Sequence, residues 1–183
     1  MSLIVGIDPG LTGAIAALHA DGTIAWIEDM PIAEHKNAAG KQRNKVDSAE
    51  LFAMLLAREV EEIIGCVALE IQQPMRRKNK KTGVEESQGS SSTGRLMEGY
   101  GMIQGVLGSL KIKPVFVRPQ AWRKHHLLEP GKDPSLTRAR QLWPECLLLD
   151  RKKDHGRADA LLIAEWGRTH QNGNAPRGKD CET

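Results

Sequence analysis

The sequence contains no hydrophobic run that approaches the roughly 20 apolar residues needed to cross a bilayer. Its N-terminus also lacks the basic segment, apolar stretch and small-residue cleavage site of a secretory signal. Cysteine is scarce, and Cys66, Cys146 and Cys181 are widely spaced without a Cys-x-x-Cys pair. We therefore expect free thiols rather than disulfides or a zinc site, in a cytoplasmic protein with no membrane partner.

The chain has 183 residues, of which 40% are hydrophobic. This length suffices for one substantial core and is short for two full domains. Residues 171–183 are polar and rich in glycine and asparagine, which is typical of a disordered tail. We expect one domain over residues 1–170, followed by that tail.

The formal net charge is only +3, but the positive residues are clustered. The run at residues 76–81 places five cations in six positions, and further groups occur at 36–45, 118–126, 138–140 and 151–153. One charged run usually marks nothing more than a solvated surface. Five clusters in a chain of this size favour a polyanionic partner.

The first candidate functional residue is Asp8, at the end of the apolar run at residues 3–8. Such a run predicts a strand buried on both faces, so a carboxylate at its end needs a compensating partner. The alternative is that Asp8 only caps the following Pro-Gly turn by accepting backbone N–H groups.

The second candidate is Glu70, near the end of an apolar strand predicted at residues 66–71. Between the two acids, residues 14–18 and 23–27 predict a hairpin, 32–46 a mobile loop, and 47–65 a helix that begins with a capping box. A strand, a helical crossover and a second strand form a right-handed parallel unit, which could place Glu70 beside Asp8. Two acids at those strand ends could share a metal; the alternative is that Glu70 is an exposed edge residue.

Residues 72–92 form a long, basic, Gly/Ser-rich segment that leaves directly from the Glu70 strand. At this length a segment without hydrophobic periodicity is either functional or disordered. A basic segment beside an acidic site suits phosphate-backbone binding, and Met75 could wedge between bases. The predicted DNA-binding residues are Met75, Arg76, Arg77, Lys78, Lys80 and Lys81, joined by Arg118, Arg123 and Lys124 after a strand at 113–117.

Two helices complete the pattern. The helix predicted from Thr93 contains five glycines, which suggests close backbone contact with a strand or a second subunit. A dimer interface is one reading of that helix. The last helix, predicted over residues 158–166, carries Asp159 in its first turn beside an otherwise apolar stretch.

Taken in order, four stretches resemble the RuvC-like Holliday-junction resolvases of phage or prophage type, within the ribonuclease H-like (retroviral integrase-like) superfamily. They are Val5-Gly6-Ile7-Asp8-Pro9-Gly10, Ala68-Leu69-Glu70, Arg118-Pro119 to Trp122, and Ala158-Asp159-Ala160-Leu161. The resemblance implies an α/β ribonuclease H-like fold with a five-stranded mixed sheet, three strands antiparallel and then two parallel, flanked by helices.

The resemblance also implies that Asp8, Glu70 and Asp159 are catalytic metal ligands. The family's fourth ligand lies three residues before Asp159, where this chain has Gly156. At 100° per residue, His155 lies about 40° from Asp159 on a helix and Asp154 about 140° away. We therefore expect His155 to be the fourth catalytic and metal-binding residue, with Asp154 as the alternative and otherwise the helix N-cap.

Clustered carboxylates repel unless divalent ions neutralise them, and oxygen ligands favour Mg²⁺ or Mn²⁺. The resemblance implies two such ions per active site and paired nicking of four-way DNA junctions by a homodimer, in a bacterial or phage-infected cell. Alternatives are a related nuclease for other branched DNA or for RNA, and a non-catalytic nucleic-acid-binding module. An actin-like ATPase shares the Gly-x-Asp-x-Gly opening but needs a second domain of similar fold.

Overall fold

A five-stranded mixed sheet forms the middle of the computed structural model, which describes residues 2–36, 40, 42–73, 76–78, 85–87, 89–128 and 133–171. For residues 76–78, 85–87, 90 and 171 it describes the backbone alone. The strand order is β3-β2-β1-β6-β9. These strands are β1 (Leu3–Ile7), β2 (Ala14–Leu18), β3 (Ile24–Asp29), β6 (Ile64–Glu70) and β9 (Val115–Val117).

The pairing within the sheet confirms the predicted fold. β1 pairs antiparallel with β2, and β2 antiparallel with β3, whereas β6 runs parallel to both β1 and β9. The β2–β3 hairpin turns where the sequence predicted it: Gly22 has a φ of 90°, and the Asp21 carboxylate accepts a hydrogen bond from the Thr23 amide at 2.9 Å. Glycine adopts that backbone conformation without steric cost.

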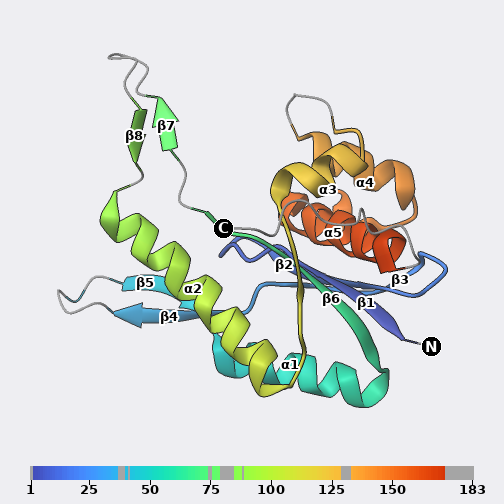
Figure 1. Cartoon of the computed structure of the whole chain (residues 1–183), viewed down its shortest axis with the longest axis horizontal. Helices are drawn as coiled ribbons and strands as arrows, with labels where there is room; N and C mark the ends of the chain where they lie inside the picture. Colours follow the sequence, from blue (N-terminus) through green and yellow to red (C-terminus); the bar gives the residue numbers. More distant parts are fainter. Residues whose placement is uncertain are drawn as a thin grey trace.

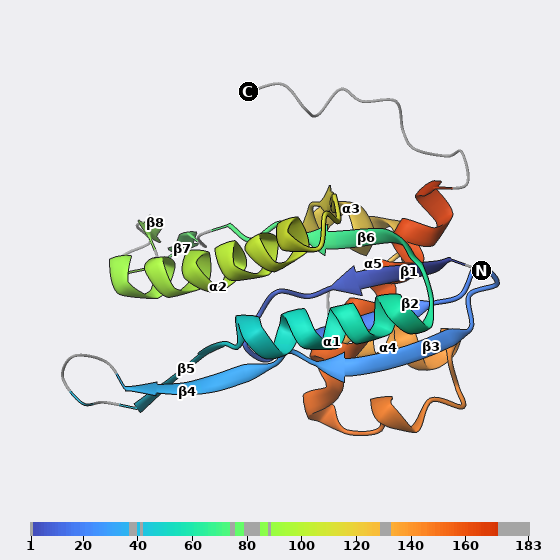
Figure 2. The same ribbon diagram turned by 90° about the horizontal axis from the view of Figure 1, so that it is seen from below.

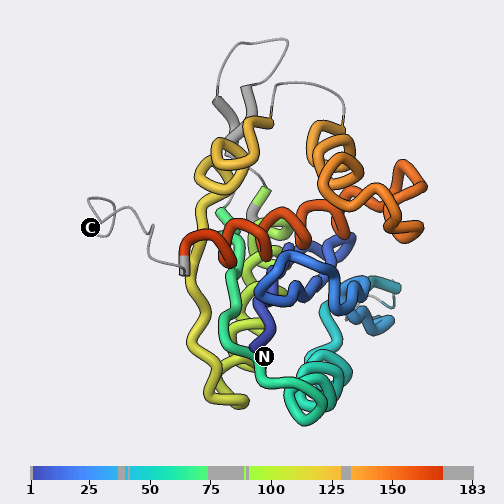
Figure 3. The backbone as a smooth tube through the Cα atoms, turned by 90° about the vertical axis from the view of Figure 1, so that its right-hand side faces the viewer, coloured from blue at the N-terminus to red at the C-terminus, as the bar shows by residue number. Residues whose placement is uncertain are grey.

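Helices cover both faces of the sheet (Figures 1 and 2). One face packs against α1 (Ser48–Glu61) and α2 (Ser90–Ser109), which contribute Leu51, Leu55, Ile103 and Leu107 to the core. The other face packs against α3 (Pro119–His125), α4 (Pro134–Leu142) and α5 (His155–Gln171). Figure 3 shows α5 crossing the sheet on the side opposite α1. Two short 3₁₀ turns, η1 (Leu147–Leu149) and η2 (Lys152–Asp154), lead into α5.

Two hairpins replace segments that the sequence predicted as irregular. Residues 32–46, expected to be a mobile loop, contain β4 (Ile32–Lys36) and β5 (Gln42–Val46), which pair antiparallel. Within 72–92, β7 (Arg76–Lys78) pairs with β8 (Glu85–Ser87). The β4–β5 strands are largely exposed on both sides, so they lack the apolar alternation that marks a half-buried strand.

Element boundaries also differ from the prediction. Helix α1 ends at Glu61, so that Gly65 lies inside β6 instead of closing the helix, and α5 begins at His155, three residues earlier than expected. Helix ends are set by tertiary packing as much as by local sequence. Among the described residues, no helix is long and apolar enough to cross a membrane.

Candidate active site

Asp8 and Glu70 meet at one edge of the sheet. β1 and β6 are parallel neighbours with Ile7 opposite Leu69, so Asp8, one residue past β1, and Glu70, the last residue of β6, occupy adjacent positions. The carboxyl ends of parallel strands are where open α/β sheets form ligand sites. The predicted placement of these two acids at one sheet edge therefore matches the strand register.

Asp159 reaches the same edge because α5 lies directly on β1. A Cβ atom at Gly6 would collide with the Ala160 carbonyl oxygen and the Ala164 amide, so glycine in the middle of β1 permits this close approach. Asp159 precedes Ala160 in α5 and is thereby held over the end of β1.

Gly156 has a similar steric role at the start of α5. A Cβ atom there would collide with the Thr12 carbonyl oxygen and crowd Gly13, in the turn that follows Asp8. Position 156 therefore has no room for a side chain in this packing.

Burial and mutual repulsion dominate the electrostatics of Asp8. Loss of solvation, followed by the negative charges of Asp159 and Glu70, raises the pKa of Asp8 to about 8. The Gly10 amide donates to Asp8 Oδ1 at 3.4 Å and opposes the shift weakly. Three carboxylates thus share one poorly solvated region, an arrangement typical of functional sites.

Glu70 is oriented by a tryptophan from α3. The indole Nε1 of Trp122 donates to Glu70 Oε1 at 2.8 Å, and the Trp122 side chain is 1% exposed. Burial and, more weakly, the negative charge of Asp159 raise the pKa of Glu70. The hydrogen bond from Trp122 and the positive charge of Arg123 lower this pKa, but the net change is a rise. The Arg123 guanidinium carbon lies 5.6 Å from the centroid of the Trp122 ring.

Among the described residues, one carboxylate oxygen of Asp159 has a hydrogen-bond donor and the other has none. Burial raises its pKa, while a hydrogen bond from Ser135 and the charges of Arg123 and His155 lower it in part. Within the described part of the chain, Asp159 Oδ1 is buried and has no hydrogen-bond partner. A buried carboxylate oxygen without a donor is unfavourable unless a cation or water satisfies it.

This donor set fits a hard divalent cation. The three carboxylates offer oxygen ligands, burial raises the pKa of each of them, and one buried oxygen is unsatisfied among the described residues. The acids are coupled electrostatically but not preassembled: the described residues contain no group of three or more His, Cys, Asp or Glu side chains placed to hold a metal.

Asp154 and His155, the two candidates for the fourth catalytic residue, have different surroundings in the structure. Asp154, whose side chain is 2% exposed, accepts hydrogen bonds from the Arg151 backbone amide at 2.8 Å and from the Arg151 guanidinium, and Arg157 lies 3.9 Å away. Burial alone would raise the pKa of Asp154, but these Arg151 contacts lower it. His155 is exposed, and its charge acts on Asp159. The local geometry therefore favours His155, whose catalytic role stays a prediction.

The predicted DNA-binding residues are only partly described. Met75, Lys80 and Lys81 lie outside the described residues, and Arg76, Arg77 and Lys78 are described as backbone in β7. Arg118 precedes α3, whereas Arg123 and Lys124 lie in its last turn, and all three are exposed. Arg123 is the member of this group that acts electrostatically on Glu70 and Asp159.

Sequence reasoning assigned no role to the two side chains that hydrogen-bond the acids, although Trp122 lies in one of the stretches that carry the resemblance. Trp122 lies 52 residues from Glu70, and Ser135 comes from a different helix than Asp159, so no local pattern joins them. The glycines were a usable signal, because Gly in the interior of a buried strand indicates close backbone approach.

Comparison with known proteins shows which solved structures have a similar fold. No protein-family model matches the chain. A structure titled T. thermophilus RuvC in complex with Holliday junction substrate covers 93% of both chains with a TM-score of 0.55 and 13% sequence identity. A second Thermus thermophilus RuvC structure covers 92% of this chain and 93% of that one, with 16% identity and a TM-score of 0.48.

One curated relative matches in sequence over a short stretch. It is the chloroplastic Holliday junction resolvase MOC1 of Chlamydomonas reinhardtii, 62% identical over 37 residues. That match spans 20% of this chain and 4% of the relative's length. The expected resemblance is therefore confirmed for the fold: over nearly its whole length, this chain is similar to RuvC.

Proposed function

We propose that this protein is a metal-dependent, structure-specific endonuclease that resolves four-way DNA junctions by paired phosphodiester nicks. The observation that carries the proposal is the convergence of Asp8, Glu70 and Asp159 at the ends of β1, β6 and the start of α5, in a fold similar to RuvC. Three desolvated carboxylates are unfavourable together, which supports a role in binding divalent cations.

In this proposal Asp8, Glu70 and Asp159 hold Mg²⁺ or Mn²⁺, two ions per site, which would activate a water and stabilise the leaving oxygen of the cleaved strand. Trp122 fixes the direction of the Glu70 carboxylate through its indole N–H. Ser135 does the same for Asp159. His155, exposed beside Asp159, is placed to accept or donate a proton at the edge of the site.

The four-way junction is the substrate named for both kinds of relative, the RuvC complex and the MOC1 resolvase. Symmetric nicking of such a junction requires two active sites, and we propose that a homodimer supplies them. Helix α2 supports this proposal: a Cβ atom at Gly94, Gly101, Gly105 or Gly108 would meet nothing within 4 Å, so part of its glycine-rich surface is open to a second chain.

The test is a cleavage assay on labelled four-way junctions with Mg²⁺, using flap, linear duplex and branched RNA substrates for comparison. We expect paired nicks in the four-way DNA junction. A preference for flaps or for RNA would support the proposed metal site but show that the substrate is not the four-way DNA junction. Absence of cleavage on every substrate, with folded protein and either Mg²⁺ or Mn²⁺, would refute the proposed activity.

A further inference from the structure

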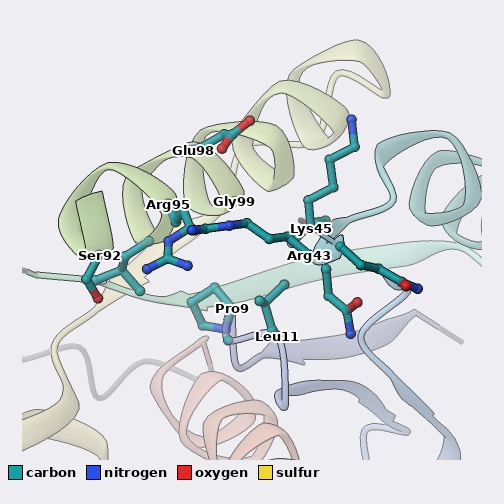
Figure 4. A pocket seen from close by; sticks show the side chains of 13 residues that line it. Pro9, Leu11, Arg43, Lys45, Ser92, Arg95, Glu98 and Gly99 are labelled. Atoms are coloured by element: carbon teal, nitrogen blue, oxygen red, sulfur yellow. The ribbon is translucent and has the colours of Figure 1, made fainter. Parts of the chain in front are cut away.

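A pocket of about 540 Å³ lies between β5, the first half of α2 and the turn that follows β1 (Figure 4). We call it the β5–α2 pocket. Its charged lining residues are Arg43 and Lys45 from β5 and Arg95 and Glu98 from α2, and Leu11 from the turn lies at its base. None of these residues belongs to the acidic site or to the predicted DNA-binding set.

The pocket has three cations and one acid, and its cations are not neutralised. In the part of the chain that the structure describes, none of Arg43, Lys45 and Arg95 forms an ion pair. Arg43 Nε is buried and without a hydrogen-bond partner there. Arg95 is oriented by its Nε, which donates to the Ser91 carbonyl at 3.1 Å. Figure 4 shows Arg43 extending from β5 across the pocket toward Arg95.

Two guanidinium groups that converge without acidic partners favour an anionic ligand. Arginine presents a planar fork of N–H donors that matches phosphate oxygens, and a buried N–H without an acceptor is unfavourable until a ligand supplies one. A volume of about 540 Å³ exceeds what a single phosphate fills and suits a short stretch of sugar-phosphate backbone. Leu11, 46% exposed, adds apolar surface for a sugar or base.

The pocket lies against the turn that directly follows Asp8. Pro9, Gly10 and Leu11 line it and directly follow Asp8, whose Oδ1 accepts a hydrogen bond from the Gly10 amide. On the α2 side, Tyr100 follows the lining residues Glu98 and Gly99, and the Glu70 charge, after burial, raises the pKa of Tyr100. A strand lying in the pocket would therefore run beside the turn that holds Asp8.

We propose that the β5–α2 pocket binds the phosphodiester backbone of the strand to be cut, with Arg43 and Arg95 holding the phosphates next to the one at Asp8. This inference rests on the proposed nuclease function and adds to it the path of the cleaved strand. It also gives the β4–β5 hairpin a role: the hairpin, whose second strand contains Arg43, extends beyond the sheet on the same side as the start of α2 (Figure 2).

The first test measures salt dependence of binding. A fluorescein-labelled four-way DNA junction is titrated with protein in EDTA over a range of KCl concentrations, so that affinity is measured without cleavage. For Arg43→Gln/Arg95→Gln, the slope of log affinity against log salt should be smaller by about 0.9 if both arginines hold one phosphate, and by about 1.8 if each holds its own.

The matched control is Lys111→Gln/Lys113→Gln, which removes the same charge from exposed positions before β9, at the end of the parallel strands away from Asp8 and Glu70. Its slope should equal that of the unmodified protein. Circular dichroism checks that both double variants are folded. An unchanged slope in Arg43→Gln/Arg95→Gln, or no DNA binding by the unmodified protein, would overturn the inference.

The second test locates the contact. Neutral methylphosphonate linkages are introduced one at a time along a junction strand. In the unmodified protein, substitution at one or two positions beside the cleavage site should weaken binding, and the same substitutions should have no further effect on Arg43→Gln/Arg95→Gln. Equal sensitivity in both proteins would place those phosphates elsewhere and refute the pocket assignment.

Cleavage with Mg²⁺ separates this inference from the proposed function. If the protein cuts junctions but Arg43→Gln/Arg95→Gln leaves the salt slope unchanged, the proposed function stands and the pocket assignment is refuted. If Arg43→Gln/Arg95→Gln reduces the salt slope but the unmodified protein cuts no substrate, the phosphate-binding pocket is supported and the proposed nuclease function is refuted.

Discussion

Replacing Asp8 by asparagine should stabilise the metal-free protein at neutral pH, although it removes a proposed catalytic group. Burial and the charges of Asp159 and Glu70 raise the pKa of Asp8 from 3.8 to about 8. A carboxyl group whose pKa is higher in the folded than in the unfolded protein opposes folding once the unfolded chain ionises. An amide of the same shape does not ionise, so Asp8→Asn removes this effect.

The magnitude follows from the two pKa values. Below pH 3.8 the group is protonated in both states and contributes nothing. Between pH 3.8 and pH 8 the unfolded chain releases a proton that the folded protein keeps, and the free energy of unfolding falls by about 1.4 kcal/mol per pH unit. At pH 7 the upper bound is about 4 kcal/mol, and solvent relaxation around this partly exposed group reduces the expected gain to about 2–4 kcal/mol.

The assay is urea denaturation in EDTA at several pH values between about 2.5 and 8. The stability advantage of Asp8→Asn should be near zero at pH 4 and grow as the pH rises. Asp154→Asn is the control with the opposite sign: hydrogen bonds from Arg151 outweigh burial and lower the pKa of Asp154, so this variant should be less stable at pH 7, and the loss should diminish as the pH falls below 3.8. Added Mg²⁺ should stabilise the unmodified protein and leave Asp8→Asn largely unchanged.

If Asp8→Asn is less stable than the unmodified protein at pH 7 in EDTA, or if the difference does not change with pH, Asp8 is not held in a desolvated, repulsive site. The argument for a cation among the three carboxylates would then lose its electrostatic basis.

Three further predictions concern the surroundings of the acids. Trp122→Phe removes the indole N–H from Glu70 and should weaken Mg²⁺ binding, measured by calorimetry, by about 10- to 100-fold, since a hydrogen bond to a charged group contributes about 1.5–3 kcal/mol. Unchanged affinity would show that Trp122 does not position Glu70. His155→Ala should lose most cleavage activity, His155→Asp should recover part of it, and Asp154→Asn should lose little, because His155 is the one expected to act on the metal or the attacking water. The reverse ranking in the same cleavage assay would assign the role to Asp154. Gly156→Ala should lower the free energy of unfolding by about 1–3 kcal/mol because its methyl group meets the Thr12 carbonyl, and equal stability in urea would disprove that close packing.

The central sheet and the positions of the acids were accessible from the sequence because their signals are local. A buried strand ending in Asp8, a helical crossover and a second buried strand ending in Glu70 predict parallel neighbours, and β1 and β6 are paired in that way. The start of α5 was predicted three residues late, but Asp159 still fell on the correct helix.

What the sequence did not predict depends on contacts between distant segments or on charged strands. The hydrogen bond from Trp122 to Glu70 joins residues with no shared periodicity. Most residues of β4 and β5 are polar and only Val46 is buried, so these strands resemble a loop in hydrophobic pattern. The β5–α2 pocket, which combines both kinds of feature, was therefore not foreseen.

The most direct test of the proposed activity is cleavage of a labelled four-way DNA junction by the unmodified protein, compared with Asp8→Asn, Glu70→Gln and Asp159→Asn in the same Mg²⁺ buffer. We predict paired nicks in opposing strands for the unmodified protein, and no cleavage by any of the three variants, with junction binding intact or tighter because each variant removes a negative charge near phosphate. A variant that cuts at a near-normal rate would show that its residue lies outside the metal site, and cleavage by all three would contradict the account.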